Sequence, residues 1–351
     1  MRINWLGAVV LAALLLAGCG GGGGNDKSEA ADAGGKQAAA AEKAKQGPRI
    51  DTRGSEKQAS VWVTLEGWEG PENVSLLMAE KHGDFKEERI SPLVLTPLSP
   101  KRTIPYVVSG VDSLGVAYGP EAVAARAKGV PIVIVGNVLQ QATAAFIWTK
   151  ESGIKDVADL AGKTIAVPGL SFQLSFLRKL LMDAGLKRSD VHIIKVGYDL
   201  VPALAKGRAD AIFGGSEDVE GVELESRGLE PVVTPVTDLG VPNYDELVLV
   251  ARRDLAEANP KLMKDFVAAM ARGAHAAVRQ PKEAAEALEV SGESNPETSH
   301  SAMRKQVSSA VGKLSGSGSI DSARLQHLID WMSENGMIEE DYPVEELLPD
   351  Y

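Results

Sequence analysis

From residue 60 onward, short apolar runs alternate with amphipathic stretches. Apolar runs rich in β-branched residues indicate strands, and stretches with a helical apolar period indicate amphipathic helices. The predicted strands cover residues 61–65, 90–96, 115–118, 131–136, 164–167, 191–196, 211–213 and 246–250. The predicted helices cover residues 72–82, 121–128, 172–184, 260–279 and 321–334. This alternation predicts parallel sheets with helices on both faces.

The strand–helix units fall into two blocks, which predict two lobes of an α/β fold. One lobe comprises residues 60–143 and the mostly helical tail, 244–351, and the other comprises residues 144–243. The chain is expected to cross between the lobes near Ala144 and Thr237, so that these crossings form a hinge. A ligand would then lie in the cleft between the lobes, at the carboxyl ends of the strands.

Residues 1–18 have the pattern of a signal peptide. Arg2 gives a positive start, and the apolar run at 5–17 is too short to span a bilayer core of roughly 30 Å. Cys19 is the only cysteine, and the sequence Leu-Ala-Gly-Cys at 16–19 resembles a bacterial lipobox. We therefore expect cleavage before Cys19, lipidation of its thiol and a location at the outer face of a membrane. The alternative is an ordinary secretory signal with an incidental cysteine.

Residues 19–59 separate this segment from the first strand. Glycines fill positions 20–24, and the rest is rich in Ala, Lys, Gln and Glu. Low hydrophobicity and low complexity predict a disordered tether. A flexible chain of about 40 residues reaches on the order of 35 Å, so a monomeric globular part could sample the volume just above the membrane.

Composition argues against several classes of function. The net charge of −11 does not suit a nucleic-acid-binding surface. With the single cysteine assigned to the anchor, the chain has no thiol for a disulfide, a nucleophile or a metal site. The five histidines are scattered without the spacing of a zinc site. We therefore predict no metal, no cofactor and no nucleic-acid partner.

Four segments carry a resemblance to a known family. They are Asp-Leu-Ala-Gly-Lys-Thr-Ile at 159–165, the run at 196–211, Asp-Val-Glu-Gly-Val at 218–222, and the run at 240–248. Together they resemble the nitrate/sulfonate/taurine-type solute-binding proteins of ABC importers, and within these the branch that captures thiamine pyrimidine precursors. The resemblance implies a two-lobed periplasmic-binding-protein fold of type II, a small-molecule ligand held by cleft closure, and an ABC permease as partner.

The segment at 66–73 is expected to face the cleft. The family places an aromatic residue here that stacks on the flat ring of the ligand, which the resemblance assigns to Trp68, with Asn73 beside it. The alternative is a tryptophan of the core or of the lobe interface. The hydroxyl groups of Ser113 and Tyr118 could orient a small polar ring, unless they serve only in a turn and a helix cap.

The segment at 167–173 is a third candidate wall of the cleft. Ser171 is a good N-cap for the helix predicted at 172–184, and that helix start could present amide groups to an anion or to ring acceptor atoms. Phe172 could complete an aromatic sandwich, with Gln173 next to it. A purely capping role for Ser171 is the alternative.

Asp218 and Glu220 follow a predicted strand, where the family has a side-chain amide and a carboxylate. A carboxylate accepts hydrogen bonds from an aminopyrimidine edge, whereas a sulfonate or nitrate has no donor to offer. The alternative is that Glu217 and Asp218 only stabilise a helix dipole. Tyr244 and Asp245 lie at the return crossing and are interpreted as hinge structure.

These observations predict an extracytoplasmic binding lipoprotein that delivers a thiamine pyrimidine precursor to an ABC permease. Riboflavin, or an alkylsulfonate, taurine or nitrate, is the alternative ligand; Lys101 and Arg102, the nearest candidate anion ligands, are placed on a surface turn. The alternative class is a pyrimidine-precursor synthase, whose fungal members use a cysteine-rich loop and a pyridoxal cofactor. Because the chain has no cysteine for such a loop, we predict that it is not an enzyme.

Overall fold

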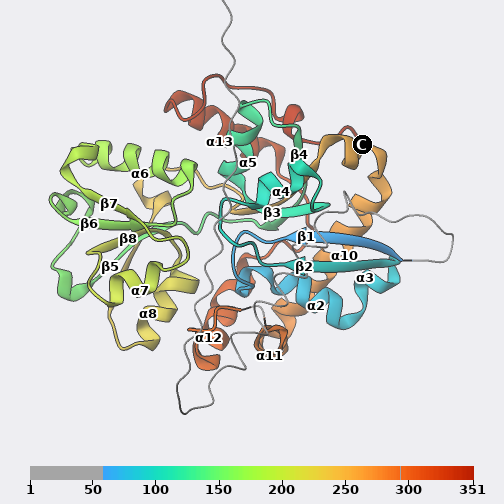
Figure 1. Cartoon of the computed structure of the whole chain (residues 1–351), viewed down its shortest axis with the longest axis horizontal. Coiled ribbons are helices and arrows are strands. Elements are labelled where there is room, and N and C mark those ends of the chain that lie inside the picture. Colours follow the sequence, from blue (N-terminus) through green and yellow to red (C-terminus); the bar gives the residue numbers. More distant parts are fainter. Residues whose placement is uncertain (1–57, 293) are drawn as a thin grey trace, which may run out of the picture. The chain divides into compact units, whose positions relative to one another are not determined.

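The computed structural model describes residues 58–292 and 294–351 (Figure 1). The predicted signal peptide, Cys19 and all but the last two residues of the predicted tether lie outside the described residues. The chain divides into two units, Met1–Lys45 and Gln46–Tyr351, and the description below concerns the second. In the part that the structure describes, no helix is both long and apolar enough to cross a membrane.

The first sheet has the strand order β2-β1-β3-β10-β4. Its strands are β1 (Ala59–Thr64), β2 (Ile90–Leu95), β3 (Leu114–Tyr118), β4 (Ile132–Leu139) and β10 (Leu247–Arg252). Strands β1, β2 and β3 are parallel, and β10 runs antiparallel to both β3 and β4. We call this sheet and its helices lobe I.

The second sheet has the strand order β7-β6-β8-β5-β9. Its strands are β5 (Ala145–Thr149), β6 (Thr164–Val167), β7 (His192–Lys195), β8 (Ala211–Gly215) and β9 (Pro231–Pro235). Here β5 is the reversed strand, antiparallel to β8 and β9. We call this sheet and its helices lobe II.

The prediction of wholly parallel sheets is therefore wrong for one strand in each sheet. A parallel neighbour requires a crossover connection, usually a helix. Strands β5 and β10 instead begin directly after the two crossings between the lobes, so no crossover helix fixes their direction. Strands β5 and β9 were also absent from the strands predicted by apolar pattern.

Helices cover both faces of each sheet, as Figure 1 shows for α6 against α7 and α8 in lobe II. The longer helices are α2 (Val74–His82), α4 (Thr103–Ser109), α5 (Gly119–Ala127), α6 (Ser171–Asp183), α10 (Pro260–Arg279), α11 (Pro281–Ser291), α12 (His300–Ala310) and α13 (Ser322–Glu334). The shorter α-helices are α3 (Asp84–Glu87), α7 (Leu200–Ala205), α8 (Val222–Ser226) and α9 (Arg253–Ala258). Single turns are η2 (Pro71–Asn73), η3 (Lys150–Ser152), η4 (Val157–Leu160), η5 (Arg188–Asp190), η6 (Glu217–Gly221), η7 (Val236–Leu239), η8 (Val311–Lys313) and η9 (Val344–Leu347).

Helix boundaries follow local chemistry. The prediction for 260–279 is confirmed, because Pro260 suits the first helical position and a strongly amphipathic stretch follows it. Ser171, however, is not an N-cap: α6 begins at Ser171 itself and its cap position is Leu170, whose backbone is extended. Leu170 is 2% exposed, so its burial in the core fixes the helix start one residue earlier than the capping pattern suggests.

Helix α10 packs closely on α2 in lobe I. A Cβ atom added at Gly273 would lie 2.0 Å from the backbone oxygen of Ser75 and 2.6 Å from the backbone nitrogen of Ala79. No side chain larger than hydrogen fits at this position without moving one helix away from the other.

The two chain crossings, 140–144 and 240–246, are joined by hydrogen bonds. The amide of Ala142 donates to Oδ1 of Asn243 (3.0 Å). Oε2 of Glu246 accepts from the amides of Thr143 (2.6 Å) and Ala144 (3.1 Å). The same region holds the buried Tyr244, whose ring meets Phe176 edge-on at 6.0 Å, and Asp245, which pairs with Arg324 at 2.9 Å.

Candidate functional site

Two adjoining cavities lie at the carboxyl ends of β1, β3 and β8. They share the lining residues Glu66, Glu72, Tyr118, Gly214, Val219 and Glu220. The first also contains Asp218 and Glu246, and we name it the acidic chamber. The second also contains Trp68 and Tyr198, and we name it the aromatic chamber. Because both sheets contribute lining residues, both chambers lie between the lobes.

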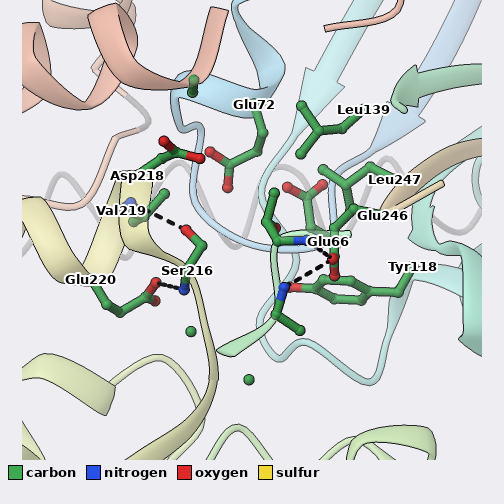
Figure 2. A pocket seen from close by; sticks show the side chains of 15 residues that line it. Glu66, Glu72, Tyr118, Leu139, Ser216, Asp218, Val219, Glu220, Glu246 and Leu247 are labelled. Atoms are coloured by element: carbon green, nitrogen blue, oxygen red, sulfur yellow. Dashed lines mark hydrogen bonds between the residues drawn. The ribbon is translucent and has the colours of Figure 1, made fainter. Parts of the chain in front are cut away.

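The acidic chamber brings together five carboxyl groups (Figure 2). Lobe I supplies Glu66 after β1, Glu72 on η2 and Glu246 just before β10, and lobe II supplies Asp218 and Glu220 on η6. Strands that end at the same edge of a sheet deliver these side chains to one place. Only Asp218 and Glu220 of this set were predicted as site residues.

Burial and mutual repulsion change the acidity of the chamber. Burial raises the pKa of Glu66 to about 7. Burial, reinforced by the nearby Glu66, raises the pKa of Glu72 to about 8. Burial also raises the pKa of Glu220 to about 7 and the pKa of Glu246 above its usual value. Glu66, Glu72 and Glu220 therefore exchange protons near neutral pH, so the chamber can respond to the charge of a ligand that enters it.

Several of the carboxylates are oriented by fixed donors. The amide of Asn73 donates to Oε1 of Glu66 (3.3 Å), and the backbone N–H of Ser216 donates to Oε2 of Glu220 (2.7 Å). Asn73 is completely buried, so it positions Glu66 from behind the chamber wall. In contrast, the buried Oε2 of Glu72 has no hydrogen-bond partner among the described residues.

Asp218 has its partners within the protein. Its carboxylate accepts from the hydroxyl of Ser309 and from the ammonium group of Lys313, and it is almost fully buried. It also lies in the first turn of η6, where Ser216 is the N-cap, accepting from the amide of Val219 at 3.1 Å. Asp218 therefore lines the chamber with a carboxylate whose charge is already balanced by the ammonium group of Lys313.

An aromatic pair closes the second chamber. The rings of Trp68, from lobe I, and Tyr198, from lobe II, have their centroids 6.1 Å apart at an angle of 55°. The hydroxyl of Tyr198 also donates to the backbone oxygen of Pro97 in lobe I (3.4 Å). Trp68 is 37% exposed, so its ring remains accessible to a ligand. Tyr198 was not predicted as a site residue, although its position just after β7 could have indicated it.

The predicted sandwich partner, Phe172, lies elsewhere. It is buried and packs against Tyr118 at 5.5 Å and against Phe176 at 5.7 Å. It thus supports Tyr118, which does line both chambers. Burial and the nearby Glu66 raise the pKa of the Tyr118 phenol well above its usual value, so this hydroxyl keeps its proton.

The structure does not bring the remaining predicted residues to either chamber. Ser113 is buried just before β3, at the opposite end of that strand from Tyr118. Ser171 is exposed at the start of α6. Gln173 is buried beneath the wall, where its amide nitrogen lies 2.7 Å from the position of a Cβ atom added at Gly214. Lys101 is exposed, as predicted.

The described lining residues of the two chambers include no histidine, cysteine or lysine. Within residues 58–292 and 294–351, no three His, Cys, Asp or Glu side chains are arranged to hold a metal ion. The described lining residues of both chambers include no lysine to form a Schiff base. The polar and aromatic groups of the described lining are therefore carboxylates, the phenols of Tyr118 and Tyr198, several hydroxyl and amide side chains, and the ring of Trp68.

Comparisons with known proteins agree with this architecture. Residues 70–284 match the family described as NMT1/THI5 like. A formylaminopyrimidine-binding protein of Halalkalibacterium halodurans is 30% identical over 229 residues, which cover 65% of this chain and 69% of that protein. A 4-amino-5-hydroxymethyl-2-methylpyrimidine phosphate synthase of Legionella pneumophila is 27% identical over 237 residues, covering 67% and 74%.

Among solved structures, the periplasmic aliphatic sulphonate binding protein SsuA of Escherichia coli superposes with a TM-score of 0.62. The two chains are 17% identical, and the match covers 82% of this chain and 91% of SsuA. At this identity the likeness establishes the fold alone. The chain therefore has the periplasmic binding protein fold and belongs to the NMT1/THI5-like family.

Proposed function

We propose that this protein is the extracytoplasmic solute-binding component of an ABC importer and that its ligand is an aminopyrimidine of the thiamine-precursor type. The observation that carries the proposal is the pairing of the two chambers: carboxylates from both lobes beside the Trp68–Tyr198 pair.

The acidic chamber selects by hydrogen-bond direction. Ionised carboxylates only accept hydrogen bonds, and an aminopyrimidine offers an amino group and, when protonated, a ring N–H as donors. Glu66, Glu72 and Glu220 are the acceptors in this proposal: their raised pKa values leave them partly protonated before a ligand enters, and the donors of the ligand favour their ionised form. A sulfonate or nitrate would bring further negative charge and no donor, so the acidic chamber disfavours both.

The aromatic chamber selects for a flat ring. A ring that enters between Trp68 and Tyr198 replaces their mutual contact with contacts to itself. Each such ring pair adds about 0.5–1.5 kcal/mol beyond the burial of surface. Because one ring belongs to each lobe, stacking on both favours the closed form over the open one, which is the differential affinity that closure requires.

The relative from Halalkalibacterium halodurans supports this ligand class, since it is named as a formylaminopyrimidine-binding protein. Other relatives are named as synthases. A synthase of that kind would show turnover and a lysine Schiff base, and the chambers present no lysine. Binding without chemistry is the function that these lining residues favour.

The remaining parts of the proposal concern location and partners. Lipidation of Cys19 anchors the protein at the outer face of a membrane, and residues 20–59 act as the tether. The protein works as a monomer and delivers its ligand to the membrane-spanning subunits of an ABC permease.

Thermal unfolding of the purified full-length protein against a ligand panel tests the proposal. The panel contains formylaminopyrimidine, 4-amino-5-hydroxymethyl-2-methylpyrimidine, thiamine, riboflavin, taurine, an alkanesulfonate and nitrate. A ligand at 100 times its Kd stabilises the folded state by about 2.7 kcal/mol. We expect stabilisation by the aminopyrimidines, clearly reduced in Trp68→Ala and retained in full in the control Tyr351→Ala, whose ring is exposed. Stabilisation by sulfonates or nitrate alone would refute the acidic-chamber argument.

A further inference from the structure

Helix α12 belongs to the core of lobe I and reaches across to lobe II. Its residues Met303 and Val307 are buried in the hydrophobic cluster that contains β1, β3, α2 and α10. On its other side α12 lies against η6 and α8 of lobe II, and Figure 1 shows α12 beside α8. The helix is therefore in a position to hold the two lobes together.

Three polar contacts make this connection specific. Ser309 donates its hydroxyl hydrogen to one oxygen of the Asp218 carboxylate, and the ammonium group of Lys313 pairs with the other. The side-chain amide of Gln306 donates to the backbone oxygen of Val219 at 3.0 Å. All three donors come from α12 and the turn that follows it, and both acceptor residues lie on η6.

Lys313 is also fixed to the hinge. Its backbone oxygen accepts from the amide of Gln140 at 3.1 Å, and the next residue, Leu314, forms a β-bridge with Leu139 at the end of β4. The backbone of Lys313 is thus attached to the crossing segment of lobe I, while its side chain pairs with Asp218 of lobe II. Lys313 therefore connects the crossing segment at Gln140 to η6, which forms the lobe II wall of the chambers.

The wall held in this way is the one that faces the ligand. Turn η6 carries Val219 and Glu220, which line both chambers. Resting on the proposed function, we infer that Ser309, Lys313 and Gln306 form a latch that positions η6 and favours the closed form. In this inference Asp218 accepts the hydrogen bond of Ser309 and pairs with Lys313, and it does not accept hydrogen bonds from the ligand.

Ligand affinity tests the latch against direct binding by Asp218. Because the apparent Kd rises as the closed population falls, Lys313→Met should raise the Kd for formylaminopyrimidine by about tenfold or more in titration calorimetry. Lys313→Arg should restore most of the affinity. The matched control is Lys305→Met, an exposed lysine on the outer side of α12. If Asp218 instead bound the ligand, Lys313→Met would free its carboxylate, and unchanged or tighter binding would overturn the latch.

Two further comparisons test the latch independently, namely a pair of serine variants and a double-mutant cycle. Ser309→Ala should weaken binding, and the neighbouring exposed Ser308→Ala should not. Asp218→Asn and Lys313→Met act on the same contact, so the double variant should be little weaker than either single variant. Fully additive losses would mean that the two residues act separately, which contradicts the inference.

The separation of the lobes can be measured without any ligand. Spin labels at Lys101→Cys in lobe I and Lys187→Cys in lobe II, both exposed, report the distance in full-length protein that also carries Cys19→Ser. Lys313→Met should broaden the distribution toward longer distances, and Lys305→Met should leave it unchanged. Identical distributions would overturn the latch. Failure of the unmodified protein to bind any aminopyrimidine would refute the proposed function, and this distance measurement would still decide on the latch.

Discussion

The Glu66→Gln substitution removes a buried charge and keeps an acceptor oxygen for Asn73. Glu66 is 4% exposed, and burial raises its pKa from 4.5 to about 7. The folded protein therefore binds this proton more tightly than the unfolded chain does. Protonated Glu66 therefore adds to the free energy of unfolding. This contribution is complete below about pH 4.5 and is lost as the pH rises through about 7.

The difference between 4.5 and about 7 corresponds to roughly 3 kcal/mol, at about 1.4 kcal/mol for each pH unit. Glutamine at this position carries no charge at any pH. We therefore expect Glu66→Gln to be more stable than the unmodified protein by about 3 kcal/mol near pH 8.5 and by less than about 1 kcal/mol near pH 5. At the same time it should bind aminopyrimidines more weakly, because one acceptor carboxylate is missing.

Urea unfolding at several pH values between 5 and 8.5 measures this difference. The matched control is Glu339→Gln, an exposed carboxyl group outside both chambers, which should follow the unmodified protein at every pH. Curves for Glu66→Gln and the unmodified protein that stay parallel across the range would show that Glu66 titrates normally. The account of the acidic chamber as a desolvated carboxyl cluster would then be wrong.

Three further changes test packing, stacking and the hinge. Gly273→Ala should lower the free energy of unfolding by about 1–3 kcal/mol or more, because its Cβ atom overlaps the backbone of α2. Trp68→Ala and Tyr198→Ala should each weaken aminopyrimidine binding by at least about 0.5–1.5 kcal/mol in calorimetry. Arg324→Met leaves the buried Asp245 carboxylate without its ion-pair partner and should destabilise the fold by about 3–5 kcal/mol.

Each of these changes has its own control. Gly312→Ala adds a methyl group in open space and should leave stability nearly unchanged. Tyr351→Ala removes an exposed ring outside the chambers. Arg324→Lys restores a positive charge near Asp245, so a loss of stability as large as that of Arg324→Met would attribute the effect to packing of the Arg324 side chain instead of to the ion pair.

Much of the fold could be predicted because local pattern and global packing agree. The strand at 164–167 and the helix at 260–279 have the predicted bounds. The reversed strands β5 and β10 could not be predicted, since their direction depends on where the chain crosses between lobes. The apolar and aromatic run at β5 (Ala145–Thr149) could have been predicted as a strand, whereas the short run at β9 (Pro231–Pro235) is bounded by prolines, which argue against a strand.

The candidate site was predicted only in part, for a physical reason. Trp68, Tyr118, Asp218 and Glu220 line the chambers. The strand-end position indicated Tyr118, and the family resemblance indicated the other three. Glu66 and Glu72 lie within a segment expected to face the cleft, yet acidic loop residues are usually solvated. In the chambers they are surrounded by residues of both lobes, and contacts between residues so far apart in the sequence leave no local signal.

The contact between Asp218 and Lys313 could not be predicted from the sequence either, because the two residues are far apart along the chain. The two residues are 95 positions apart, and each alone resembles an ordinary surface charge. Only the placement of α12 against η6 makes them partners, so their pairing depends on tertiary structure and not on any local motif.

The hydrogen bonds from Asn243 and Glu246 to the opposite crossing have a mechanical consequence. Two separate strands of chain could bend and also twist independently, which would let the lobes swivel past one another. Three cross-links over a few residues turn the pair into a ribbon that flexes easily about one axis and resists torsion. In the proposed closure, such a ribbon favours one path of approach, which would bring Trp68 and Tyr198 together in the same register each time.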